Sequence, residues 1–62
     1  MRKLINTTLK NGYIVSTTLI DGIYETMVLD TDFEELEQER HESEETARKV
    51  HDSYILKYSK GI

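Results

Sequence analysis

Apolar and β-branched residues gather in three runs in the first half of the chain. The runs span residues 3–9, 13–20 and 23–29, and they are rich in Ile, Val, Leu, Thr and Tyr. Because β-branched and aromatic side chains suit a pleated strand better than a helix, each run predicts a β-strand.

Short polar pairs separate these runs. Asn11-Gly12 lies between the first two, and Asp21-Gly22 lies between the second and the third. Both pairs readily adopt the positive φ angles of a type I′ turn, which is a common two-residue connection of a β-hairpin. The three runs are therefore predicted to form an antiparallel three-stranded meander with a type I′ turn at each pair.

Side chains alternate between the two faces of a strand, which allows the faces to be compared. The second run places on one face Tyr13, Val15, Thr17 and Leu19, and on the other Ile14, Ser16, Thr18 and Ile20. Neither face is wholly polar, and the third run is mixed in the same way. One helix covers only one side of a sheet, so the second side is expected to be Thr-rich and wetted, or packed on a partner.

Residues 34–41 are almost entirely charged or polar and have good helix propensity. Only Leu36 could anchor them as a helix, however, and a helix without an apolar face is not stable by itself. We therefore predict a short fourth strand over residues 35–41 at the edge of the sheet, with a helix as the alternative. A charged edge strand also resists edge-to-edge aggregation.

An amphipathic pattern defines the end of the chain. Its apolar stripe recurs at spacings of three and four residues and consists of Ala47, Val50, Tyr54 and Tyr58. Ser43 is a suitable N-cap, and Lys60 followed by Gly61 suits a helix C-terminus, so we predict a helix over residues 44–59. Together the patterns predict a single α+β domain over residues 1–62. It is an antiparallel β-meander of three strands and a short fourth, with one C-terminal amphipathic helix packed on one face.

The length and composition limit the stability that the core can supply and indicate the compartment in which the protein is expected. A chain of 62 residues without cysteine has no disulfide, and its core is expected to supply about 3–5 kcal/mol of stability. Apolar runs nowhere exceed three residues, whereas a bilayer span needs roughly 20. The N-terminus also lacks the apolar run of a secretory signal. We therefore expect a cytoplasmic protein without a membrane partner.

The net charge of −4 is unevenly distributed. Residues 30–45 hold nine acids and one base, whereas residues 46–62 hold four bases and one acid. An acidic block repels phosphate, so a nucleic-acid partner is not expected. The favoured interpretation is a solvated loop and strand edge; the alternative is an acidic DNA mimic that inhibits a host nucleic-acid-binding protein. The residues predicted for a partner surface are Glu34, Glu35, Glu37, Glu39 and Leu56.

Four short motifs resemble those of a known group of proteins. They are Tyr24-Glu25-Thr26-Met27-Val28, Glu39-Arg40-His41, Glu44-Glu45-Thr46-Ala47 and His51. With them, the chain resembles a group of small uncharacterised bacteriophage and prophage proteins that have a Tyr-Glu-Thr-Met-Val strand and a C-terminal Glu-Glu-x-Ala-x-x-x-His helix. The connector before the fourth strand is shorter here. The resemblance implies a phage or prophage origin, a location in the host cell and a β-meander-plus-helix fold, but it implies no activity.

His51 is the most informative single candidate, because it lies within the apolar stripe of the predicted helix. It could be a ligand, a base or a pH sensor, but the favoured interpretation is a structural, half-buried imidazole bonded to a sheet backbone group or a hydroxyl. His41 could join it at a metal, together with Glu44 or Glu45. Zinc needs three or four convergent ligands, and the two histidines are ten residues apart without a local pair. No metal and no cofactor are therefore expected.

The serines and glycines do not form a motif for catalysis. No serine lies in a Gly-x-Ser-x-Gly elbow, and the three glycines cannot form a phosphate cradle. We therefore expect no catalytic residues and no enzyme activity. The four tyrosines are expected to pack in or around the core, since base stacking needs a positive groove. By elimination, the predicted function is that of an accessory protein that binds an unidentified protein partner or forms a homodimer.

Overall fold

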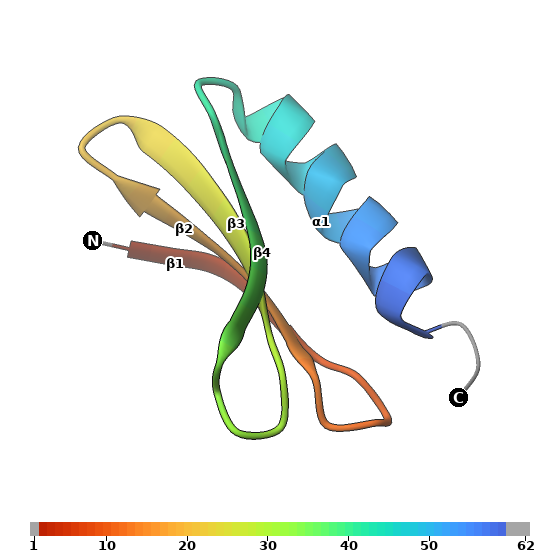
Figure 1. The fold of residues 1–62 in the computed structure, drawn as a ribbon. Helices are drawn as coiled ribbons and strands as arrows, with labels where there is room; N and C mark the ends of the chain where they lie inside the picture. The colour runs from red at the N-terminus through yellow and green to blue at the C-terminus, as the bar shows by residue number, and fades with distance from the viewer. Residues whose placement is uncertain (1, 60–62) are drawn as a thin grey trace.

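The computed structural model describes residues 2–59, which form one antiparallel sheet and one helix. The elements are, in chain order, β1 (Arg2–Thr8), β2 (Ile14–Ile20), β3 (Ile23–Leu29), β4 (Glu35–His41) and α1 (Glu44–Ser59). The strand order in the sheet is β1-β2-β3-β4, and α1 packs against one side of it (Figure 1). The predicted α+β meander with a C-terminal helix is confirmed, and residues 35–41 form the fourth strand rather than a helix.

The β2–β3 connection has the predicted two-residue turn. Asp21 and Gly22 have φ angles of 49° and 79°, and Ile20 pairs with Ile23 on either side of them. Two consecutive residues with positive φ are the mark of a type I′ turn, whose twist matches the twist of the flanking strands. The turn therefore fixes the register in which β2 and β3 pair.

The β1–β2 connection is not a type I′ turn, so the prediction for Asn11-Gly12 is wrong. The Leu9 N–H donates to the Tyr13 carbonyl over 2.8 Å, and the Gly12 N–H donates to the Leu9 carbonyl over 2.9 Å. Of the residues in this loop, Gly12 alone has a positive φ, which is 93°. The connection is thus a three-residue loop, a type I turn followed by a left-handed residue. The Asn11 side chain favours this loop, because its Oδ1 accepts the Tyr13 N–H over 3.0 Å and its Nδ2 donates to the Tyr58 carbonyl over 3.1 Å.

The β3–β4 connection repeats this three-residue loop without a glycine. The Asp30 N–H donates to the Glu34 carbonyl over 2.9 Å, and the Phe33 N–H donates to the Asp30 carbonyl over 3.0 Å. Phe33 has a φ of 63°, which is unfavourable for a bulky residue, and it is 71% exposed. The Asp30 carboxylate holds the loop in place by accepting the N–H groups of Asp32 and Glu34.

Helix α1 begins at the predicted cap. The Ser43 hydroxyl accepts the Thr46 N–H and the Ser43 carbonyl accepts the Ala47 N–H, so the N-cap is confirmed. The side of α1 that faces the sheet buries Ala47, His51 and Tyr54. The expected C-terminal signal, Lys60 and Gly61, lies outside the described residues.

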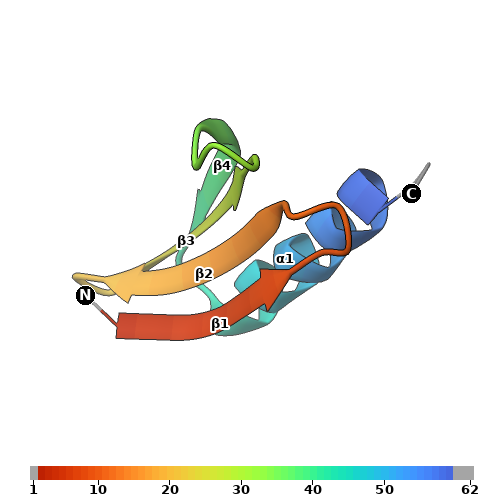
Figure 2. The same ribbon diagram turned by 90° about the horizontal axis from the view of Figure 1, so that it is seen from below.

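The two faces of the sheet have different environments. Val15 pairs with Val28 and Thr17 pairs with Thr26, and none of these four residues is exposed, because α1 packs over them. The two valines belong to the core of the protein. The residues that alternate with them in β2 and β3 point to the opposite face. No other element of residues 2–59 covers that face (Figure 2).

Candidate binding surface

The sheet face that α1 leaves uncovered carries aliphatic side chains at both ends. Cross-strand pairs join Ile14 with Leu29 at one end and Ile20 with Ile23 at the other, and Met27 lies between them. All five are half-buried by their neighbours in the sheet. We call this side the open face; its residues in β2 and β3 are Ile14, Ser16, Thr18, Ile20, Ile23, Glu25, Met27 and Leu29.

A hollow lies at one end of the open face, next to the β2–β3 turn. Ile20 and Ile23 form its apolar part, Glu25 and Arg40 form its polar part, and its volume is about 380 Å³. The two isoleucines flank the type I′ turn, which holds them in register. The open face therefore combines a depression, aliphatic side chains and two opposite charges in one place.

Glu25 and Arg40 neutralise each other within the open face. They lie opposite each other in the register of β3 and β4, and the Arg40 Nε donates to the Glu25 Oε2 over 2.9 Å. The Glu25 side chain is only 12% exposed, whereas the Arg40 side chain is 67% exposed. A carboxylate that is largely removed from water needs such a charged donor. The pair thus lets the aliphatic part of the face in β2 and β3 carry one acid and one base that balance each other. On the flanking strands the same face is polar, with Lys3 opposite Thr18 and Gln38 opposite Met27.

The residues predicted for a partner surface do not all lie together. Glu34 and Glu35 are exposed next to the start of β4, and Leu56 is 69% exposed on the outer side of α1. Glu37 and Glu39 instead lie on the side of the sheet that α1 covers. The structure therefore brings Glu37 and Glu39 together and places Leu56 apart from them.

Glu37 and Glu39 join β4 to α1. Glu37 accepts hydrogen bonds from the Lys57 ammonium, over 2.6 Å, and from the Tyr58 hydroxyl, while Glu39 accepts one from the Tyr54 hydroxyl over 2.9 Å. The donors from α1 lower the pKa of Glu37, and the bond to Glu37 raises the pKa of Lys57. Burial, together with the Glu39 carboxylate, raises the pKa of Tyr54. Sequence reasoning missed these contacts because the partners are 15 to 21 residues apart.

His51 lies at the centre of a buried polar network. It is 1% exposed, and its ring meets two hydroxyls: Nε2 lies 3.0 Å from Thr7 Oγ1, and Nδ1 lies 2.8 Å from Thr17 Oγ1. Thr17 Oγ1 lies in turn 2.8 Å from Thr26 Oγ1. Burial lowers the pKa of His51, so the neutral imidazole is favoured. The hydroxyl partner expected from the sequence is present, but the ring is fully rather than half buried, and it links α1 to β1, β2 and β3.

The two histidines lie in different environments. Both ring nitrogens of His51 are engaged by hydroxyls, whereas His41 Nε2 lies 3.5 Å from a Glu39 carboxylate oxygen and has no hydrogen-bond partner among the described residues. Within residues 2–59, no three His, Cys, Asp or Glu side chains are grouped so that they could hold a metal ion. The combination of His41, His51 and Glu44 or Glu45 therefore does not converge on one point.

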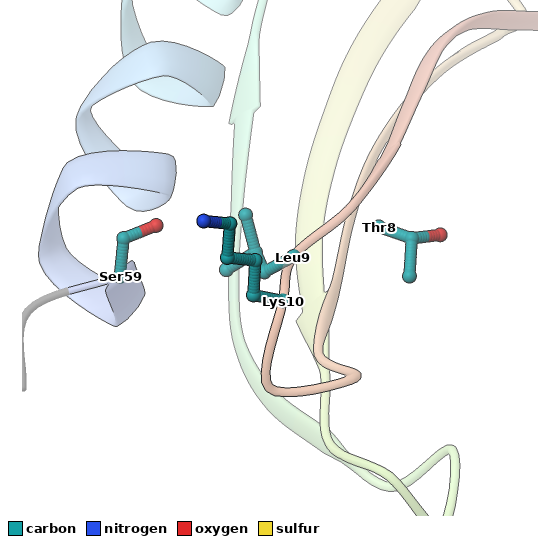
Figure 3. A pocket seen from close by; sticks show the side chains of 4 residues that line it. All are labelled: Thr8, Leu9, Lys10 and Ser59. Atoms are coloured by element: carbon teal, nitrogen blue, oxygen red, sulfur yellow. The ribbon is translucent and has the colours of Figure 1, made fainter. Parts of the chain in front are cut away.

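A second hollow lies between the β1–β2 loop and the last turn of α1 (Figure 3). Its lining residues are Thr8, Leu9, Lys10 and Ser59, and its volume is about 420 Å³. Figure 3 shows the Lys10 and Ser59 side chains pointing toward each other across it, whereas Thr8 points away. The C-terminal end of a helix carries a partial negative charge, which opposes the binding of an anion by the single lysine. We therefore assign no ligand to this hollow.

Comparisons with known proteins give no match: no protein-family model, no curated protein and no solved structure matches the chain. In the part of the chain that the structure describes, no helix is long and apolar enough to cross a membrane. Packing against α1 accounts for the residues of the covered face. It does not account for the aliphatic side chains, the hollow and the ion pair of the open face.

Proposed function

We propose that this chain is a small accessory protein of phage or prophage type that acts by binding another protein through its open face. The observation that carries the proposal is the aliphatic content of that face, namely Ile14, Ile20, Ile23, Met27 and Leu29. An antiparallel sheet with one covered side normally presents polar residues to water on the other side. Aliphatic side chains gathered on the uncovered side are typical of a protein-binding surface.

The mixed character of the open face suits a protein partner better than a nucleic acid. The hollow beside Ile20 and Ile23 has room for an apolar side chain, and Glu25 and Arg40 supply charged hydrogen-bonding groups next to it. Protein interfaces commonly combine an apolar centre with polar groups around it. A phosphate-binding surface needs an excess of cations, whereas the charge of Arg40 is balanced by the Glu25 carboxylate beside it.

The acidic alternative, mimicry of a DNA phosphate track, receives less support. A mimic needs a row of carboxylates that are free to meet the cations of its target. Two members of the acidic block are instead engaged within the chain, because Glu37 pairs with Lys57 over 2.6 Å and Glu44 pairs with Arg48 over 2.8 Å. We therefore rank mimicry second to binding through the open face.

The phage or prophage part of the proposal depends on the sequence resemblance. In the fold, the Tyr24–Val28 motif lies within β3, where Glu25 and Met27 belong to the open face and Thr26 and Val28 lie under α1. One short motif thus contributes to both the core and the proposed binding surface. A partner is accordingly expected among the proteins of a bacterial host cell or of the phage itself.

A pull-down from a bacterial lysate with two matched variants tests this proposal. Met27→Lys places a charge in the middle of the open face, and Leu56→Lys places the same charge on the outer side of α1. We expect at least one protein to bind the unaltered chain and Leu56→Lys but not Met27→Lys. Equal retention by both variants would contradict binding through the open face. Binding that high salt and the pair Glu34→Gln and Glu35→Gln abolish, but Met27→Lys does not, would favour mimicry instead.

A further inference from the structure

We infer that the partner on the open face is a second copy of this chain, so that two sheets pack face to face around a two-fold axis. The inference rests on the proposed function and deepens it, because it names the occupant of the same face. Three features support it: a charge pair that is complementary to itself, a thin core, and a face with the area of a weak dimer interface.

Glu25 and Arg40 give the open face a charge pattern that is complementary to its own copy. In a two-fold interface the same patch meets itself, so residue i contacts j while j contacts i. An axis that passes between these two side chains, at the β3–β4 side of the sheet, would bring the Arg40 of each chain to the Glu25 of the other. Among residues 2–59, the Arg40 side chain makes one hydrogen bond, from Nε, whereas a guanidinium carries five N–H donors. Its largely exposed side chain therefore retains donors for a second carboxylate.

The core of a single chain is thin, so a second sheet would add much to the buried apolar surface. The buried hydrophobic residues are Leu9, Val15, Val28, Ala47 and Tyr54. Polar residues occupy much of the remaining interior between the sheet and α1, namely Thr17, Thr26 and His51. Chains below roughly 70–80 residues often gain stability from disulfides, metals or oligomerisation, and this chain has no cysteine. Packing a copy on the open face would bury its aliphatic side chains without any change in the fold.

The open face has the area of a small, reversible interface. Each strand has seven residues, so at a strand spacing of about 4.8 Å and a rise of about 3.3 Å per residue the four strands cover about 440 Å² in projection, which is an upper limit because the axis lies off the centre of the face. Stable complexes bury about 800 Å² on each side, so this dimer belongs to the weak, micromolar class.

Sedimentation velocity with two charge-reversal variants tests the inference. We expect the unaltered protein to change from monomer to dimer between about 5 and about 500 μM. Glu25→Arg and Arg40→Glu each place two like charges in the pair, so either variant alone should dimerise at least about tenfold more weakly. An equimolar mixture of the two should recover the dimer, because each variant supplies the charge that the other lacks. Ion pairing within one chain cannot produce this recovery.

Met27→Lys and Leu56→Lys complete the test. The first should weaken the dimer and the second should not, and circular dichroism of every variant separates loss of association from loss of fold. A protein that stays monomeric at about 500 μM would overturn the inference, as would a mixture that dimerises no better than the single variants. A dimer that Met27→Lys leaves intact would overturn it too, because another surface would then hold the copies. If the protein is monomeric and Met27→Lys still loses a captured protein, the proposed function stands and this inference fails.

Discussion

Replacing Phe33 by glycine should stabilise the protein, although it removes a large side chain. Phe33 occupies the left-handed position of the β3–β4 loop at a φ of 63°, and Gly12 occupies the corresponding position of the β1–β2 loop at 93°. The two loops have the same pair of backbone hydrogen bonds. The chain therefore contains an internal reference for the glycine form of this loop.

The expected gain at Phe33 is the difference between two opposing effects. A residue with a Cβ atom in the left-handed region costs about 1–2 kcal/mol, which glycine avoids. Glycine loses more backbone entropy on folding, which costs about 0.5–1 kcal/mol. Little packing is lost, because the ring is mostly exposed. We expect a net stabilisation of about 0.5–1 kcal/mol, which raises the Tm of a domain of this size by roughly 2–8 °C.

Urea unfolding followed by circular dichroism measures this difference, with Gly12→Ala as the reciprocal control. Alanine at that position keeps the unfavourable positive φ, and its Cβ would lie 3.0 Å from Thr31 Cγ2. We expect it to destabilise the protein by about 1 kcal/mol or more. Both variants should be measured at a protein concentration below the range in which the proposed dimer forms. If Phe33→Gly is less stable than the unaltered protein there, the reasoning from backbone strain is refuted.

Three further predictions concern the buried network and the contact between β4 and α1. Thr17→Val should destabilise the fold by about 1–3 kcal/mol in urea unfolding, because it leaves Thr26 Oγ1 and His51 Nδ1 without their partner; an unchanged stability would contradict the network. Burial lowers the pKa of His51 in the folded state, so the unfolded state binds the proton more readily. Stability should therefore be complete above about pH 6.5 and fall as the pH drops below it, and urea midpoints of His51→Gln should lack this slope. Hydrogen bonds from α1, the first of them from Lys57, lower the pKa of Glu37, so its contribution to folding stability is present above about pH 4.5 and is lost on acidification. Glu37→Gln should therefore flatten the dependence of stability on pH between about pH 5 and 3. A slope equal to that of the unaltered protein would contradict the contact.

The strands and the helix could be predicted because each depends on neighbours in sequence. Asp21-Gly22 sets a two-residue turn by its own backbone preferences, and Ser43 caps α1 with its own hydroxyl. The assignment of β4 followed from an argument about burial, since Leu36 alone could not anchor a helix. The loop at Asn11-Gly12 could not be predicted in the same way, because the Asn11 amide bonds the backbone of α1, far along the chain.

The binding surface could not be predicted, because it depends on which face α1 covers. Both faces of β2 carry aliphatic residues, so alternation alone did not decide between them. Thr17 and Thr26 can be buried on the covered face because His51 of α1 and the two hydroxyls themselves supply hydrogen-bond partners. The sequence alone predicts Glu37 to be part of an exposed partner surface, because its donor Lys57 is 20 residues away. In each case the deciding contact joins two distant elements.

Methyl chemical shifts measured on dilution test the central claim most directly. The methyl groups of Ile20, Ile23 and Met27 lie on the open face, whereas those of Leu56 lie on the outer side of α1. The account predicts that the open-face methyl signals move with protein concentration while the Leu56 signals stay fixed. Open-face signals that are identical at every concentration, or movement confined to Leu56, would contradict the claim that this face binds a second copy of the chain.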